Sequence, residues 1–231
     1  MVRPRGVHHL AISTRDIKTQ IEFFSDVLGF ELVALFWMHG VPGAWHGFMQ
    51  LHERSYLAFV QHPANAAIEP KIGVTHAGNG ASPSAGGTMQ HLAFDVADET
   101  QLLAMRDRVR SRGIHAFGPI DHGFCKSIYF AGPENLTLEV SSSHEAIDGD
   151  SWIDPEVAAL AGISPVELAR YRRPAVSETS SHPVPQPPLD APGPRMAYPE
   201  ALYETMVAMS DEAVLRTASE TTPPVAKGAR A

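Results

Sequence analysis

Two histidines and one glutamate occupy positions from which they could bind a divalent metal ion together. His9 and His91 each lie in an alternating segment that contains His-Leu-Ala, and Glu139 lies in a third such segment, NLTLEVSS. Leu136 and Leu138 point to one side of that predicted strand, so Glu139 points to the other. Burying a carboxylate is costly unless it meets a cation. Two imidazoles and one carboxylate form a facial triad that leaves positions on the metal open for substrate.

An ordinary role for these histidines is the competing interpretation. The chain has 12 histidines in 231 residues, and most histidines on strands are packed or surface groups. His8, beside His9, is assigned to the opposite face of the strand. What favours the ligand interpretation is that His9 and His91 hold matched positions in an internal repeat, together with an inward carboxylate.

The repeat spans residues 7–33 and 89–117. In each copy an alternating strand is followed by an Asp seven residues after the histidine, the usual type of helix N-cap. An amphipathic helix follows and ends at a glycine. The capping residues are Asp16 and Gly29 in the first copy, and Asp98 and Gly113 in the second.

Three strand-like runs follow each helix, so each copy is predicted to be a βαβββ module. The runs are 30–37, 45–52 and 55–61 in the first copy, and 114–118, 124–131 and 136–142 in the second, with turns at Gly118-Pro119 and at residues 132–135. Neither module could bury its sheet alone. We therefore expect an α+β fold in which two paired modules form a curved mixed sheet around the metal site.

The expected domain covers residues 1–144, with module one at 6–62, a linker at 63–87 and module two at 88–143. A C-terminal extension, residues 145–231, follows. It is predicted to hold two short helices within 154–172, a proline-rich segment at 174–199 and one further helix at 199–218. Two interpretations stay open: the extension wraps the domain or a partner subunit, or it is a mostly disordered tail.

Composition excludes some functions. The formal net charge of -8 argues against a nucleic-acid partner. The chain has one cysteine, no signal-like N-terminal segment and no apolar run long enough to span a bilayer, so a cytoplasmic protein without membrane contact is expected. A homodimer is the default assembly, because closed pairs are the commonest oligomers.

Residues 6–142 resemble the vicinal oxygen chelate superfamily, which includes glyoxalases, bleomycin resistance proteins and extradiol dioxygenases. The resemblance puts the metal ligands of that family on His9, His91 and Glu139. In the glyoxalase I branch a fourth ligand is common, and its place here is held by Ala58, which cannot bind metal. A three-ligand site is more similar to the type I extradiol ring-cleavage dioxygenases.

A second stretch supports the extradiol resemblance. His122, Tyr129 and Pro133 stand before Glu139 with the spacing of the extradiol signature, although Gly132 replaces the usual Asp and Asn135 replaces the usual Gly. The resemblance implies catalytic roles for His122 and Tyr129 beside a bound catecholate. A half-buried strand aromatic and a loop histidine are their ordinary interpretations.

The family's further acid/base histidine is missing, because its place falls on Ser55 or Tyr56. His52 lies near but out of register, and His46 is another possible substitute. His46, Phe48 and Phe124 are expected to contact the substrate.

The resemblance implies a metal-dependent oxidoreductase that cleaves a catechol-like aromatic substrate with O2. Fe(II) is the preferred metal, with Mn(II), Zn(II) and Ni(II) as alternatives. The missing acid/base histidine keeps open a non-oxidative isomerase or lyase, glyoxalase-like or epimerase-like, that acts on a substrate with vicinal oxygens. A protein that sequesters a small molecule, as resistance proteins do, is the third candidate.

Overall fold

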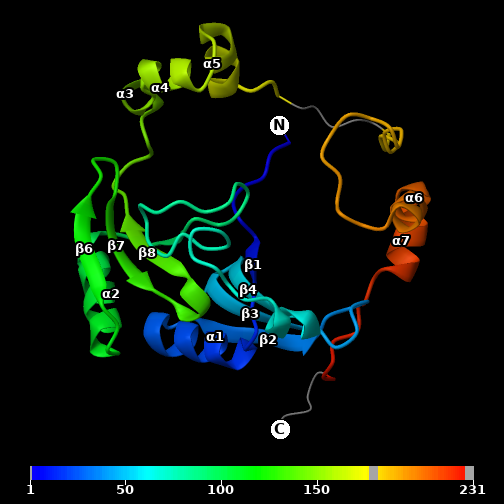
Figure 1. The fold of residues 1–231 in the computed structure, drawn as a ribbon, viewed down its shortest axis with the longest axis horizontal. Coiled ribbons are helices and arrows are strands. Elements are labelled where there is room, and N and C mark those ends of the chain that lie inside the picture. The colour runs from blue at the N-terminus through cyan, green and yellow to red at the C-terminus, as the bar shows by residue number, and fades with distance from the viewer. Residues whose placement is uncertain (1, 177–181, 227–231) are drawn as a thin grey trace.

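The computed structural model describes residues 2–176 and 182–226, and its body consists of two modules of the same design (Figure 1). In the first, strand order is β1-β4-β3-β2, with β1 parallel to β4 and the other pairs antiparallel. Its elements are β1 (His9–Ser13), α1 (Ile17–Phe23), the π-helical turn η1 (Phe24–Leu28), β2 (Glu31–Trp37), β3 (Trp45–His52) and β4 (Ser55–Gln61).

The second module repeats this topology in the order β5-β8-β7-β6. Its elements are β5 (Leu92–Asp95), α2 (Glu99–Ser111), β6 (Ala116–Asp121), β7 (Lys126–Ala131), the 3-10 turn η3 (Pro133–Asn135) and β8 (Thr137–Ser142). A further 3-10 turn, η2 (Pro63–Ala67), opens the linker. The predicted α+β fold with paired βαβββ modules is confirmed. Within this chain, however, the modules form two four-stranded sheets rather than one continuous sheet.

Local signals in the sequence explain where the helices begin and end. The Asp16 side chain accepts hydrogen bonds from two backbone N–H groups of α1, and Asp98 caps α2 in the same way. Gly29 ends η1 with φ 81°, a left-handed conformation that favours glycine. The turn predicted at Gly118-Pro119 is wrong, because β6 continues through this pair, which is joined by a cis peptide bond.

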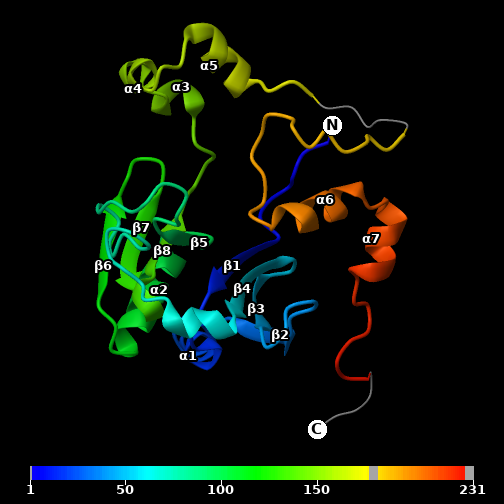
Figure 2. The same ribbon diagram turned by 45° about the vertical axis from the view of Figure 1, so that its right-hand side comes forward.

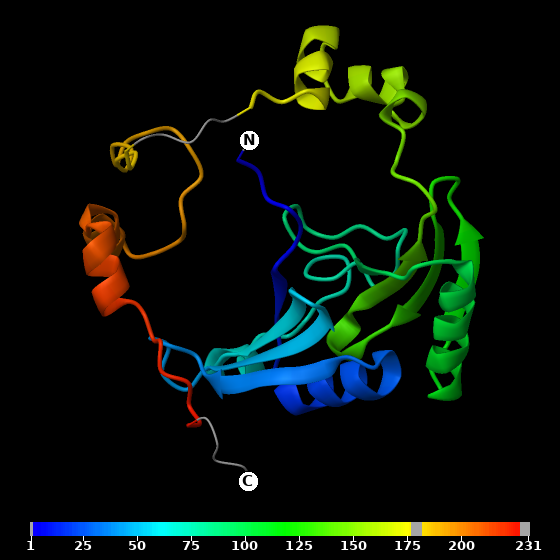
Figure 3. The same cartoon turned by 180° about the vertical axis from the view of Figure 1, so that it is seen from behind.

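One hydrophobic core lies between the helices and the outer faces of both sheets. Phe24 of η1 is fully buried and lies 5.3 Å from Phe59 of β4 and 6.2 Å from Phe94 of β5, measured between ring centroids. Figure 3 shows α1 and α2 outside the two sheets, with the linker crossing the opposite, inner side. The inner faces are therefore the surfaces left for a functional site.

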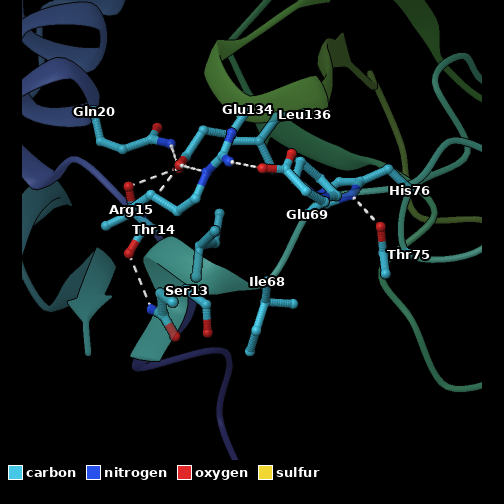
Figure 4. A pocket seen from close by; sticks show the side chains of 13 residues that line it. Ser13, Thr14, Arg15, Gln20, Ile68, Glu69, Thr75, His76, Glu134 and Leu136 are labelled. Atoms are coloured by element: carbon cyan, nitrogen blue, oxygen red, sulfur yellow. Dashed lines mark hydrogen bonds and ion pairs between the residues drawn. The ribbon is translucent and has the colours of Figure 1, made fainter. Parts of the chain in front are cut away.

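Polar contacts hold the two modules together: Arg108 of α2 donates to the backbone oxygens of Val27 and Asp26, and a carboxylate of module two bonds to module one (Figure 4). Glu134, in η3 of module two, accepts hydrogen bonds from Thr14 Oγ1 at 2.6 Å, Arg15 N at 2.8 Å and Gln20 Nε2 at 2.7 Å, all in module one. Burial raises the pKa of Glu134, but the three donors outweigh it and the pKa falls below its ordinary value. The charged carboxylate thus helps to hold the two modules together.

The described residues of the C-terminal extension form five short helices: α3 (Gly149–Trp152), α4 (Pro155–Leu160), α5 (Pro165–Arg172), α6 (Glu200–Ala208) and α7 (Asp211–Thr217). The two helices predicted within 154–172 are confirmed. The single helix predicted at 199–218 is wrong: the chain is extended at Met209, and Ser210 caps a new helix by accepting from Ala213 N. Within the described part of the chain, no helix has the length and apolar character needed to cross a membrane.

Replacing Glu134 with Gln should lower the free energy of unfolding by about 2 kcal/mol at pH 7, because a charged acceptor with several donors is lost. Since the folded pKa is lowered, this contribution is present above the unfolded pKa and disappears as pH falls through the folded pKa. Urea unfolding of both proteins at several pH values measures it.

Glu69→Gln is the matched control, because Glu69 also pairs with Arg15 but is exposed. We expect it to change stability by less than about 1 kcal/mol. Equal effects of the two substitutions, or a Glu134 effect that is unchanged at pH 3, would contradict the role of the junction carboxylate.

Candidate functional site

His91 and Glu139 meet on the inner face of module two. His91 Nε2 lies 3.0 Å from Glu139 Oε2. Glu139 is held in the centre of the sheet, where β8 pairs it with Ala93 of β5 and Tyr129 of β7, and only 5% of the residue is exposed. Cis ligands at about 2.1 Å from a metal are about 3.0 Å apart, so this spacing fits two metal donors.

Hydroxyl groups keep the Glu139 carboxylate charged. Burial raises its pKa, but Ser127, Ser141, Tyr129 and His91 together lower it below the ordinary value. Ser141 Oγ donates to Glu139 Oε1 at 2.6 Å, and Ser127 Oγ lies 3.0 Å from Ser141 Oγ. A deprotonated carboxylate with one oxygen held by a hydroxyl leaves its other oxygen, Oε2, to bind a cation.

The other ring nitrogen of His91 is also engaged. His91 Nδ1 contacts Gln90 Oε1, and Gln90 Nε2 in turn donates to the backbone oxygen of Asn79 in the linker. If Nδ1 donates to Gln90, the Nε2 lone pair faces Glu139, and a cation between the two groups satisfies both. The donor set of this pair therefore fits a divalent metal.

His122 and Tyr129 form a second pair close to Glu139. His122 Nε2 lies 3.0 Å from Tyr129 Oη, and the Tyr129 ring lies 6.3 Å from the His91 ring. Burial and the negative charge of Glu139 raise the pKa of Tyr129 to about 12. Its phenol is therefore protonated at neutral pH and can donate a hydrogen bond to a bound oxygen.

An apolar cavity of about 530 Å³ opens beside this pair. Phe117, Ile120, His122 and Tyr129 line it from module two, and residues 78–81 of the linker line it from the other side. Sequence reasoning missed Phe117, Ser127 and Ser141, although each shares a sheet face with Glu139 or Tyr129 by strand register. It also treated the linker as a connector, whereas the linker forms one wall of the cavity.

His9 lies on the inner face of module one, among different neighbours. Its Nδ1 lies 2.9 Å from His8 Nδ1, and its ring centroid lies 5.5 Å from that of Phe48. The prediction that His8 points to the opposite face is wrong, because the His8 ring contacts both His9 and Tyr56. The backbone turns just before β1, so strand alternation does not apply to His8.

His46 shares this face with His9. Their strands place Phe48 between them, with its ring 4.5 Å from that of His46. Burial, and then the nearby His9, lower the pKa of His46. His46 Nε2 is buried and makes no hydrogen bond. A buried imidazole nitrogen without a partner is uncommon in folded proteins and points to a role that the single chain does not satisfy.

One chain therefore unites only part of the predicted triad. Among residues 2–176 and 182–226, no three His, Cys, Asp or Glu side chains come close enough together to hold a metal ion. His91 and Glu139 are brought together, whereas His9 stands on the other sheet with His46 and Phe48.

The remaining predicted site residues lie elsewhere or differ from the family pattern. Phe124 packs against Trp152 of the extension, with ring centroids 5.0 Å apart, and does not line the cavity beside Tyr129. Tyr56, at the family's acid/base position, pairs with His9 across the sheet, and the neighbouring Ser55 donates to a backbone oxygen.

A family profile matches most of this domain. Residues 6–140 match the Glyoxalase/Bleomycin resistance protein/Dioxygenase superfamily. This chain belongs to that superfamily. The membership confirms the resemblance stated from the sequence, while the extradiol subtype stays a prediction. The superfamily contains dioxygenases and other enzymes as well as binding proteins. No curated protein sequence matches the chain.

Several solved structures are similar to this chain. A glyoxylase/bleomycin resistance protein/dioxygenase domain from Frankia sp. EAN1pec is 15% identical, with a TM-score of 0.50, and the match covers 62% of this chain and all of that one. TnmS3, an antibiotic-binding protein from Streptomyces sp. CB03234, is 16% identical with a TM-score of 0.44, covering 62% and 99%. FosX from Listeria monocytogenes, solved with Mn(II) and sulfate, is 13% identical with a TM-score of 0.42, covering 61% and 94%.

Proposed function

We propose that this protein is an extradiol-type dioxygenase whose metal site is shared between two copies of the chain. The observation that supports it is the arrangement on module two: the His91–Glu139 pair, the His122–Tyr129 pair and an apolar cavity of about 530 Å³ lie together. In this proposal, His9 of the second copy supplies the third metal ligand.

The rigid module junction is the reason for a second copy. For His9 to reach His91 and Glu139 of its own chain, the modules would have to reorient. Glu134 would then lose its three donors in module one, and the shared core around Phe24 would open. In a twofold dimer no such change is needed, because each copy gives His9 to one site and its own His91–Glu139 pair to the other.

Two imidazoles and one carboxylate suit Fe(II), and Mn(II), Zn(II) or Ni(II) are the alternatives. When bound, the metal would hold the two vicinal oxygens of the substrate, lower the pKa of its hydroxyl group and leave a position for O2. The His91–Glu139 pair orients this centre, and Ser141 keeps the carboxylate fixed.

The side chains of module two handle the aromatic substrate and its proton. The apolar walls around Phe117 and Ile120 accept the ring, and linker residues 78–81 exclude water. The substrate hydroxyl donates to Tyr129 Oη while Tyr129 donates its own proton to His122 Nε2, 3.0 Å away, so one proton leaves the substrate and one arrives on His122. Ring cleavage breaks one carbon–carbon bond and puts both atoms of O2 into the product, so it requires no external reductant.

His46 is our candidate for the missing acid/base group. It comes with His9 from module one of the second copy and would face the substrate from the side opposite His122. Its unpartnered Nε2 supports this role, whereas Ser55 and Tyr56 offer no basic group at the family's usual position.

A non-oxidative isomerase or lyase is the second candidate. The loss of the usual acid/base histidine at Ser55 or Tyr56 favours it, since an enzyme that stabilises an enolate on a metal needs no proton transfer to an oxygen intermediate. The same metal ligands would serve both reactions, so the use of O2 discriminates between them.

Fe(II)-loaded protein should consume O2 and form a yellow ring-opened product with catechols. Tyr129→Phe should lower kcat by about 100-fold, because a positioned hydrogen-bond donor and proton relay is lost. An oxygen electrode and product absorbance measure both effects. Tyr171→Phe is the matched control, since Tyr171 is exposed on α5 and should leave kcat unchanged.

Product formation without O2 would show that the protein is an isomerase or lyase and not a dioxygenase. Tight binding of a catechol with no turnover under either condition would instead indicate a sequestering protein.

Shared ligands predict complementation between two inactive variants. His9→Ala and His91→Ala homodimers should each bind little metal. When the two chains are co-expressed in equal amounts, half of the dimers are mixed and each has one intact site, so metal content should return to about a quarter of the wild-type value.

Metal analysis of desalted protein measures this recovery independently of activity. The control is co-expression of two His9→Ala chains, which should not restore the metal content. If the co-expressed variants do not regain metal, the proposal that two chains share each metal site is refuted.

A further inference from the structure

The C-terminal extension leaves large apolar side chains in solvent. Helices α4 to α7 contribute no buried residue, and the well-packed pairs of elements in the described chain all lie within residues 9–142. Leu160 and Val166 are each 81% exposed, and Leu215 is 70% exposed. Exposed apolar side chains on several helices indicate a surface that another molecule covers in the functional assembly.

The total surface area leads to the same conclusion. The chain exposes 16813 Å² for a mass of 25.0 kDa. A compact monomer of that mass exposes roughly 10,000 Å². The excess, about 6,800 Å² per chain, is more than enough for an obligate interface of about 2,000–5,000 Å² and reflects an extension that packs little on its own body.

The extension is attached to the body at both ends. At its start, Trp152 packs on Phe124 and so closely on Gly123 that a Cβ there would lie 2.6 Å from the indole ring. At its end, Pro224 lies in an apolar groove of about 590 Å³ that includes Trp37 and Trp45 of module one. Both of these contacts place described parts of the extension against the body, one on each module.

The extension passes in front of the inner faces of the sheets. Figures 1 and 3 show the extension as a wide arc on the side of the body opposite α1 and α2, from module two round to module one. Figure 2 shows α6 and α7 lying apart from β2 and β3. The second copy that completes the proposed metal site must lie against these same inner faces.

We propose that residues 153–176 and 182–219, here called the arm, wrap around the second copy of this chain in a dimer. The inference rests on the shared site proposed above, which requires a second copy within the arc. The arm's exposed leucines and valines then pack on the surface of the partner, and the partner's arm packs on this chain by twofold symmetry.

Hydrogen exchange of the whole protein tests the arm without any substitution. Backbone amides of α4, α5, α6 and α7 should be protected at concentrations where the dimer forms. They should lose protection on dilution, in step with the fall in mass seen by analytical ultracentrifugation. Arm amides that exchange at the same rate in dimer and monomer would overturn the proposal, and so would a protein that stays monomeric at all concentrations.

Substitutions provide a second test. The triple variant Leu160→Asp, Val166→Asp and Leu215→Asp should weaken dimerisation by about tenfold or more, because desolvated apolar contacts dominate interfaces. The matched control puts the same charges at exposed alanines of the arm, Ala159→Asp, Ala169→Asp and Ala208→Asp, and should weaken it less. Equal dissociation constants for wild type and the leucine–valine variant would contradict the proposal.

The two proposals can fail separately. A dimer with a protected arm but no metal recovery in the mixed dimers would refute the shared metal site and support the arm contact. Metal recovery in a dimer whose arm exchanges freely would support the shared metal site and refute the arm contact.

Discussion

A half-buried carboxylate at the junction, together with Arg108, holds the two modules against each other. Glu134 reaches from module two to three donors in module one and is held in its charged form by them. Separating the modules would cost the hydrogen bonds of this carboxylate and of Arg108, so the junction favours the observed angle between the sheets. In the proposal made above, the surface that completes each inner face comes from a second copy of the chain.

The same principle operates within the candidate site. Glu139 is as deeply placed as a core residue, yet hydroxyl groups keep it ionised and His91 stands 3.0 Å from it. At 3.0 Å the two groups form an ion pair when Nε2 carries a proton, and a bound cation would take the place of that proton. The neutral phenol of Tyr129, next to this charge, provides a donor that the charged groups lack. Module two thus has the ligand-binding half of a centre, and module one has a histidine-rich half.

Much of this arrangement follows from local sequence signals. Capping by Asp16 and Asp98 and strand alternation around Glu139 depend on neighbours within a few residues, so the sequence predicts both modules and the facing of His91 and Glu139. The break at Ser210 was also readable as an N-cap signal, but the apolar residues on both sides favoured one helix.

Other features depend on residues far apart in the chain. Thr14 and Gln20 are 120 and 114 residues from Glu134, and no local pattern indicates that these three would meet. The angle between the modules, and with it the position of His9, was therefore beyond sequence reasoning. The contact of Phe124 with Trp152 has the same origin, since it forms only when the extension folds back on module two.

X-ray absorption spectroscopy of the metal-loaded protein tests the central claim most directly, because it counts the imidazoles bound to the metal. The account predicts two imidazoles in the wild-type dimer, and one in a His9→Ala dimer loaded with excess metal. A single imidazole in the wild-type protein, or two that persist after His9 is removed, would contradict it.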